Sequence, residues 1–228
     1  MLYYRNEDYK NMNKIEAVIF DMDGVIVDSS WYWIEVLSNI IKDHGDTITD
    51  QDKNNITGCS DDYELEILSH YIKKNKEELR QIRTDYINDH PIQYDHHIKP
   101  GIYELLNYLK EKGILISLAS SSPLKDIHRM IKELHLEEYF KVIMSGELVK
   151  KAKPDPQIYL DTVRLLNIPK ANILVVEDSI YGIQSAMNAG LEVLVLKTPE
   201  YDFDNQIYHI FDTHFDIIKE IAKINKYR

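Results

Sequence analysis

The sequence predicts an α/β fold: a Rossmann-like, three-layer core on a parallel sheet, with a small all-helical cap domain inserted after the first strand. Two observations lead to this prediction. Short apolar runs rich in β-branched residues alternate with segments of helical apolar spacing, which is typical of a parallel sheet covered by helices on both faces. Between about 30 and 90 the alternation stops, and amphipathic helical patterns continue without a convincing strand.

The predicted strands are short, continuous apolar runs, as buried strands of a parallel sheet are. They are Ile15–Phe20, Ile114–Ala119, Val142–Met144, Ile173–Val176 and Val193–Leu196. The helices predicted in the same part of the chain span 101–111, 123–135, 156–167, 179–189 and Phe215–Ile224.

Capping residues support these helix boundaries. Ser122 and Asp155 each precede a proline, a pair that favours a helix start, and Ser179 can cap the helix that follows the fourth strand. Gly190 follows the predicted end of that helix as a stop signal.

The helical insert divides the chain into two predicted domains. We expect residues 1–29 and 97–228 to form the α/β core and residues 30–96 to form the cap. The linkers around 28–32 and 89–99 would then act as the hinge. The predicted cap helices are Trp31–Ile41, Asp62–Ile72 and Lys76–Ile87.

Composition limits the classes of function. The 228 residues are 44% hydrophobic and 29% charged, which is ordinary for a globular protein. A net charge of -11 disfavours nucleic-acid binding, and the single cysteine, Cys59, excludes a disulfide framework or a multi-cysteine zinc site. The polar N-terminal segment does not resemble a signal peptide, and no apolar run is long enough to span a membrane. We therefore expect a cytoplasmic protein without a membrane or nucleic-acid partner, and we expect a monomer.

The strongest motif is Phe20-Asp-Met-Asp-Gly-Val-Ile-Val-Asp28, directly after the first predicted strand. Ligands of parallel α/β sheets sit beyond the carboxyl ends of strands, which is where Asp21 and Asp23 fall. Gly24 then lets the backbone turn sharply. A lone pair of acids is often just a solvated turn, but acids beside a buried apolar strand are costly unless something binds them.

Three further motifs follow other strands. Glu177 and Asp178 end the fourth strand, where Asp178 either caps the next helix or supplies an oxygen ligand to Mg²⁺. Ser120 and Ser121 lie at a helix start that can bind an anion, and Lys153 can neutralise a phosphate or a nucleophile. Taken singly, a serine loop and a surface lysine are the plainer interpretations.

Together these motifs resemble the haloacid dehalogenase superfamily, in its β-phosphoglucomutase-like branch. The resemblance rests on DMDGVIVD, LASSS, KPDP and VVEDSIYG, which span nearly the whole core, and this branch carries its small cap where the helical insert lies. It implies a Mg²⁺-dependent phosphatase that hydrolyses a small phosphorylated metabolite through an aspartyl phosphate.

The resemblance also implies a role for each site residue. Asp21 is the nucleophile and Asp23 the general acid and base. The metal is held by Asp21, Asp178 and the Asp23 carbonyl, while Glu177 either ligates it directly or orients a metal-bound water. Ser120, the Ser121 backbone and Lys153 would hold the phosphate oxygens. The dehalogenases of the family lack the second aspartate, so Asp23 favours phosphoryl transfer.

The cap departs from the pattern of the mutases in this branch. Trp33 stands where they carry a histidine, and Asp61 stands where they carry a phosphate-gripping arginine. An acid there would repel a second phosphate. Trp33, Cys59 and Asp61 are therefore candidates for substrate specificity, although Trp33 is equally well explained as a buried cap aromatic. Cys59 has no identifiable histidine partner and is not a candidate nucleophile.

Three alternatives remain open at this point. A sugar phosphomutase would need another cation in the cap, for which Lys73 and Lys74 are candidates. A phosphonate hydrolase would need a Schiff-base lysine, but no cap lysine lies in a recognisable context. A binding protein without turnover is disfavoured because all the motifs are intact.

Overall fold

The computed structural model describes residues 13–56, 61–199, 203 and 209–226. They form two compact units. The larger unit joins the residues up to Val27 to those from Ile98 onward, and the smaller unit is Asp28–His97.

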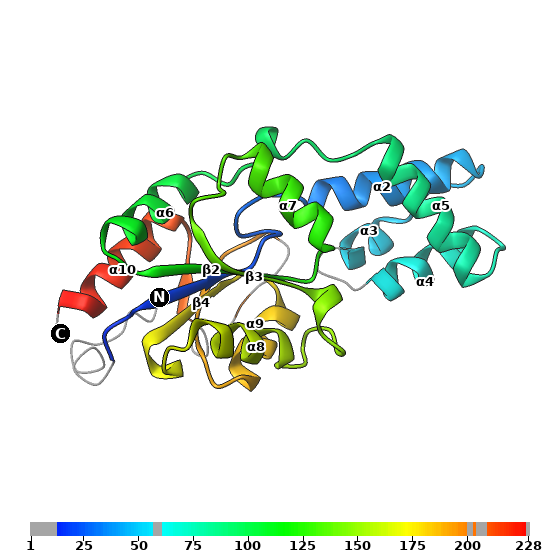
Figure 1. Ribbon diagram of the computed structural model, residues 1–228. Helices are drawn as coiled ribbons and strands as arrows, with labels where there is room; N and C mark the ends of the chain where they lie inside the picture. Colours follow the sequence, from blue (N-terminus) through cyan, green and yellow to red (C-terminus); the bar gives the residue numbers. More distant parts are fainter. Residues whose placement is uncertain (1–12, 57–60, 200–202, 204–208, 227–228) are drawn as a thin grey trace. The chain divides into compact units, whose positions relative to one another are not determined.

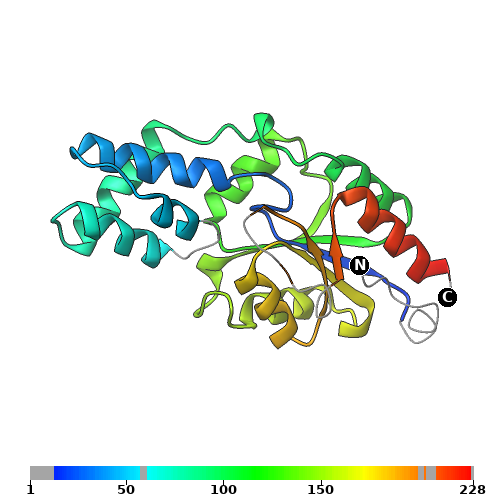
Figure 2. The ribbon, with the colours of Figure 1, turned by 180° about the vertical axis from the view of Figure 1, so that it is seen from behind.

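A six-stranded sheet forms the centre of the larger unit, with strand order β3-β2-β1-β4-β5-β6 (Figure 1, Figure 2). Each neighbouring pair of strands is parallel. The strands are β1 Ala17–Phe20, β2 Leu115–Ser120, β3 Phe140–Ser145, β4 Ile173–Glu177, β5 Glu192–Leu196 and β6 His209–Phe211. The first five confirm the predicted strands. The sequence analysis missed β6 because its three residues are too few to show a pattern.

Helices cover both faces of the sheet, so the predicted three-layer α/β core is confirmed. In Figure 1, α6, α7 and α10 lie on one face, and α8 and α9 lie on the other. Their bounds are α6 Ile102–Glu111, α7 Leu124–Glu133, α8 Gln157–Leu166, α9 Ile180–Asn188 and α10 His214–Lys226. Two short 3-10 helices, η2 Gly146–Leu148 and η3 Lys170–Asn172, complete this unit among the described residues.

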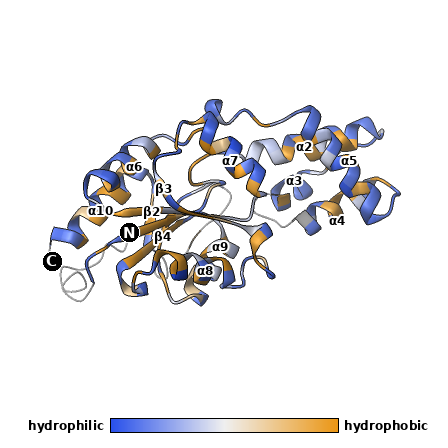
Figure 3. Cartoon of the chain, in the orientation of Figure 1, coloured by the Kyte–Doolittle hydropathy of each residue, from blue (hydrophilic) through white to orange (hydrophobic). Residues whose placement is uncertain are grey.

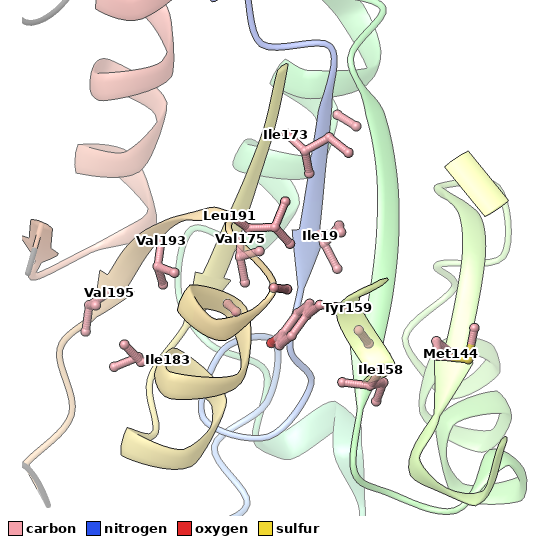
Figure 4. Close-up of a cluster of buried hydrophobic side chains, with 14 of the residues drawn as sticks. Ile19, Met144, Ile158, Tyr159, Ile173, Val175, Ile183, Leu191, Val193 and Val195 are labelled. Carbon is pink, nitrogen blue, oxygen red and sulfur yellow. The ribbon is translucent and has the colours of Figure 1, made fainter. Parts of the chain in front are cut away.

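The core on the α8 and α9 face consists of alternate strand residues and the apolar sides of these helices (Figure 3, Figure 4). Ile19, Val175 and Val193 come from three adjacent strands, and Ile158 and Ile183 come from the helices above them. These side chains are almost fully buried. The removal of these side chains from water stabilises the sheet, and the polar site residues follow the carboxyl ends of its strands.

The helix caps differ in part from the prediction. Ser179 caps α9 as expected, since its hydroxyl accepts a hydrogen bond from the Gly182 N–H at 3.1 Å. Asp155 accepts one from the Gln157 N–H at 3.0 Å, although Pro156 occupies the N-cap position of α8. The prediction that Ser122 caps α7 is wrong. Pro123 is the N-cap residue of α7, and the Ser122 hydroxyl bonds elsewhere.

Among its described residues, the smaller unit has helices as its only regular secondary structure. Its elements are α2 Ser30–Asp43, α3 Asp50–Ile56, α4 Asp61–Tyr71, α5 Lys76–Asp89 and the 3-10 helix η1 Tyr94–His96. The sequence analysis expected α2, α4 and α5 but missed α3, whose seven residues are mostly polar. A capping box between Asn75 and Glu78 fixes the start of α5.

The chain leaves and re-enters the larger unit at adjacent points. Val27 and Ile98 form an antiparallel bridge, and the Lys99 N–H donates to the Ile26 carbonyl at 2.9 Å. Within the smaller unit, the Asp28 N–H donates to the His97 carbonyl at 2.8 Å. The two ends of the helical unit are therefore tied together.

Among the helices of the described ranges, none combines the length and the apolar character needed to cross a bilayer.

Candidate active site

Three adjacent strands bring the predicted site residues to one edge of the sheet. Phe20 of β1 is in register with Leu118 of β2 and with Val176 of β4. Asp21 therefore follows β1 beside the carboxyl ends of its two neighbours, and its N–H donates to the Val176 carbonyl at 3.0 Å. The carboxyl edge is the usual ligand-binding edge of such a sheet.

The carboxylates of Asp21, Glu177 and Asp178 form a buried cluster. Their ligand atoms all lie within 4.8 Å of one another. Burial raises the pKa of Asp21 to about 8, because the attraction of Lys153 does not offset desolvation together with the repulsion of Glu177 and Asp23. Burial, with repulsion from Glu177 and Asp21, also raises the pKa of Asp178 well above its usual range. Such a cluster fits a divalent cation, which would relieve the repulsion and replace the lost water.

Lys153 lies between two of these acids. Its Nζ donates to Asp21 Oδ1 at 2.6 Å, to Glu177 Oε1 at 2.7 Å and to the Ala119 carbonyl at 3.2 Å. Burial alone would lower the pKa of this lysine, but Asp21 and Glu177 together hold the pKa well above its usual value. Lys153 is therefore a buried ammonium whose charged form is favoured beside the predicted nucleophile.

The two oxygens of Glu177 are both occupied by protein donors. Oε1 accepts from Lys153 and, at 2.8 Å, from the Tyr159 hydroxyl. Oε2 accepts from the N–H groups of Asp178 and Ser179 at 3.0 and 3.2 Å, and from the Ser179 hydroxyl at 3.2 Å. Burial acts to raise the pKa of Glu177, but Lys153 and these other donors lower it overall. Glu177 is thus a charged acid that ties β4, α8 and α9 together.

Two glycines make room for the acids. Gly24 has a positive φ of 76°, and a Cβ built on it would overlap the Asp178 carboxylate. A Cβ on Gly182, in the first turn of α9, would overlap the Glu177 carboxylate. Only glycine lets the backbone approach both acids this closely.

Asp23 lies outside the buried cluster of side chains and is half-buried. Its Oδ2 accepts a hydrogen bond from the Ser122 hydroxyl at 2.7 Å. The sequence analysis placed Ser122 in the LASSS motif and expected it to cap the next helix, but it gave this serine no individual catalytic or binding role.

The serine loop after β2 is held against its neighbours. Ser120 is buried, and its Oγ accepts from the Ser122 N–H at 3.0 Å. Gly146 packs so tightly on Ser121 that an added Cβ would lie 2.7 Å from the Ser121 carbonyl oxygen. The loop therefore has a defined backbone at the end of the strand beside β1.

Tyr159 is the other residue that the sequence analysis missed. Figure 4 shows its ring pointing from α8 toward the carboxyl end of the sheet. The residue is fully buried. Its position three residues beyond Pro156 carries no signal, because an aromatic residue at helical spacing normally indicates only a core contact.

The candidate specificity residues lie in the helical unit. Trp33 is half-buried, and the Arg83 guanidinium lies over its ring, 5.2 Å from the centroid. Asp61 is the first residue of α4, but its side chain lies outside the described part of the structure, as does Cys59. Their roles stay predictions.

A parallel sheet with buried acids and a lysine at the carboxyl ends of its strands fits an α/β protein that binds a cation and an anionic ligand at this end. Residues 18–196 match the family described as haloacid dehalogenase-like hydrolase, so the chain belongs to this family.

Individual relatives agree with this assignment. The chain is 32% identical over 188 residues to the phosphorylated carbohydrates phosphatase of Thermotoga maritima, across 78% of this chain and 83% of that protein. It is 31% identical over 190 residues to the beta-phosphoglucomutase of Bacillus subtilis, across 78% and 81%. The crystal structure of the beta-phosphoglucomutase of Clostridium difficile has a TM-score of 0.73 and 25% identity, covering 93% of this chain and 98% of that one. The expected superfamily and branch are confirmed, and the chain is a phosphomonoester hydrolase of this family.

Proposed function

We propose that this protein is a Mg²⁺-dependent phosphatase that hydrolyses a small phosphorylated metabolite, such as a sugar phosphate, through an aspartyl phosphate on Asp21. The observation that carries the proposal is the buried cluster of Asp21, Glu177 and Asp178 with Lys153 among them. The similarity to a phosphatase of phosphorylated carbohydrates supports the substrate class.

Asp21 attacks the phosphorus atom of the substrate and displaces the alcohol. A carboxylate is a weak nucleophile toward an anion, so repulsion between the two must be screened. The side chains of Asp21 and Asp178 and the backbone carbonyl of Asp23 would hold Mg²⁺, which supplies this screening when bound. Lys153 adds a fixed positive charge within hydrogen-bond distance of Asp21.

Asp23 carries the proton in both steps. It protonates the leaving oxygen, and it then removes a proton from the water that hydrolyses the aspartyl phosphate. The Ser122 hydroxyl fixes the orientation of the Asp23 carboxylate through its hydrogen bond.

The serine loop binds the transferred phosphoryl group. Ser120, the Ser121 backbone and Lys153 are assigned to its equatorial oxygens, where negative charge spreads in the transition state. The packing of Gly146 on Ser121 supports a loop that is organised before the substrate arrives.

The hydrogen bonds of Glu177 disfavour the direct metal-ligand role that was left open for it. Both carboxylate oxygens already accept hydrogen bonds from protein donors. Direct ligation would displace at least one of them. We therefore assign Glu177 to organising Lys153 and the β4–α9 turn, while Asp21 and Asp178 carry the metal.

We further propose that the helical unit is the specificity cap, and that Trp33, Cys59 and Asp61 contribute to substrate choice. We also propose a cytoplasmic monomer that acts on small phosphorylated molecules and binds neither nucleic acid nor membrane.

A screen of phosphorylated metabolites, scored by released phosphate, tests the proposed function. We expect sugar phosphates among the substrates, turnover with Mg²⁺ and none in excess chelator. Asp21→Asn should abolish turnover, and acid-quenched mass spectrometry should find phosphate on Asp21 of the wild type. Phosphate on any other residue would contradict the mechanism.

A sugar phosphomutase is the second candidate, because a relative of comparable identity is a beta-phosphoglucomutase. A mutase needs a free cation for the phosphate that does not react. In the described part of the helical unit, the best-buried cation is Arg83, and it already pairs with the buried Glu64. We therefore expect β-glucose 1-phosphate, if it reacts, to yield glucose and free phosphate, whereas efficient formation of glucose 6-phosphate would favour the mutase.

A further inference from the structure

Tyr159 contacts both charged partners that surround the predicted nucleophile. Its hydroxyl donates to Glu177 Oε1 at 2.8 Å. The Lys153 Nζ lies over its ring, 5.0 Å from the centroid, which is within the range of a cation–π contact. Tyr159 is fully buried.

The hydroxyl of Tyr159 and the ammonium of Lys153 share one acceptor atom. Glu177 Oε1 receives both hydrogen bonds, and the same ammonium reaches Asp21 Oδ1 at 2.6 Å. A second donor on Oε1 withdraws part of the negative charge that this oxygen offers to Lys153. Without that donor, the ammonium would pair more strongly with Glu177 and less strongly with Asp21.

We infer that Tyr159 is a positioning residue for the reaction, and that it keeps the Lys153 ammonium shared between Glu177 and Asp21. Its hydroxyl competes for Glu177 Oε1, and its ring supports the ammonium from the α8 side. The inference rests on the proposed function, in which Asp21 is the nucleophile and Lys153 stabilises the transferred phosphoryl group. Since Tyr159 is buried, it acts through these two residues and does not touch the substrate.

Tyr159→Phe tests the inference, because it removes the hydroxyl and keeps the ring. With p-nitrophenyl phosphate and Mg²⁺, we expect kcat to fall about tenfold to a hundredfold, the scale of one lost hydrogen bond to a charged group. KM should change far less. The matched control is Tyr103→Phe, since Tyr103 donates to the Leu134 carbonyl at 2.9 Å in the same unit but away from the acids. The control should keep the wild-type kcat.

A double-mutant cycle separates positioning from a general packing effect. In a Glu177→Gln background the charged acceptor is already lost, so Tyr159→Phe should reduce kcat further by less than about twofold. An equal loss in both backgrounds, or an unchanged kcat in Tyr159→Phe itself, would overturn the inference.

Crystal structures of the wild type and of Tyr159→Phe provide a readout that does not depend on turnover. We expect the distance from Lys153 Nζ to Asp21 Oδ1 to lengthen in the variant. An unchanged position of Lys153 would reject the inference. If the wild type released no phosphate from any ester, the proposed function would fail, and this structural comparison would still decide the positioning role.

Discussion

The Asp23 carboxylate accepts a hydrogen bond from the Ser122 hydroxyl at 2.7 Å, although the two residues are 99 positions apart in the chain. The bond links the loop after β1 to the loop after β2. It selects one orientation of the acid that we assign to proton transfer.

We expect Ser122→Ala to reduce kcat by about threefold to thirtyfold, because Asp23 keeps its carboxylate but loses a partner that orients it. Asp23→Asn should have a larger effect, about 10²–10⁴-fold, since it removes the proton carrier. Steady-state kinetics of both variants would test this order. Ser69→Ala is the control, since its hydroxyl donates to the Glu66 carbonyl on the surface of the helical unit. A Ser122→Ala enzyme with wild-type kcat would remove Ser122 from the mechanism.

The pKa of Asp21 makes the stability of the metal-free protein depend on pH. Burial raises this pKa from 3.8 to about 8, so the folded protein binds the proton more tightly than the unfolded chain does. The contribution of Asp21 to stability is therefore present below pH 3.8 and is lost as the pH rises through about 8. Asp21→Asn cannot ionise and should be more stable than the wild type at pH 8 in chelator, with a smaller difference at pH 5. Urea denaturation at both pH values measures the difference in the free energy of unfolding between the variant and the wild type. Equal stability of the two proteins at pH 8 would contradict the raised pKa of Asp21.

Removal of the divalent cation should affect both activity and stability. Asp21 and Asp178 are buried close together, so Mg²⁺ should raise the melting temperature of the wild type and chelator should lower it. Asp178→Asn should need a much higher Mg²⁺ concentration for half-maximal activity while keeping its fold. Thermal melts and Mg²⁺ titrations are the measurements. Full turnover of the wild type in excess chelator would disprove the magnesium assignment.

Gly182→Ala should be destabilising, although alanine is the better helix former by about 1 kcal/mol. The added Cβ would overlap the Glu177 carboxylate, which is held by donors on both oxygens. We expect a loss of about 1–3 kcal/mol in the free energy of unfolding and a reduced kcat.

Gly113→Ala is the control for that substitution. Unlike Gly182, Gly113 has a positive φ, 68°, and nothing lies within 4 Å of its added Cβ. Backbone strain should lower the stability of this variant, while its kcat should stay at the wild-type value. A Gly182→Ala enzyme with improved stability and unchanged kcat would show that Glu177 can move freely.

Most of the fold could be predicted from local patterns. Buried strands of a parallel sheet are continuous apolar runs, so β1 and β4 could be located by composition alone. Strand β6 and helix α3 could not. The first has only three residues, and the second, DQDKNNI, has a single apolar residue at its end.

The site was predictable only where residues follow strands. Asp21, Glu177 and Asp178 belong to strand ends, and the parallel topology brings them together. Ser122 and Tyr159 act through contacts made by the folded chain, and their local sequence favours a cap and a core position. A hydroxyl that reaches an acid 99 positions away leaves no periodic signal in the sequence.

The bridge between Val27 and Ile98 has a consequence for how this protein can change. The two ends of the helical unit meet at this bridge. A short turn from Val27 to Ile98 could therefore join the two parts of the larger unit if the helical unit were absent. Closing a shorter loop costs no more conformational entropy than closing the present one. We therefore expect that a helical segment of a different length or composition can replace the residues between Val27 and Ile98 without altering β1, which precedes Asp21, or β4, which ends at Glu177.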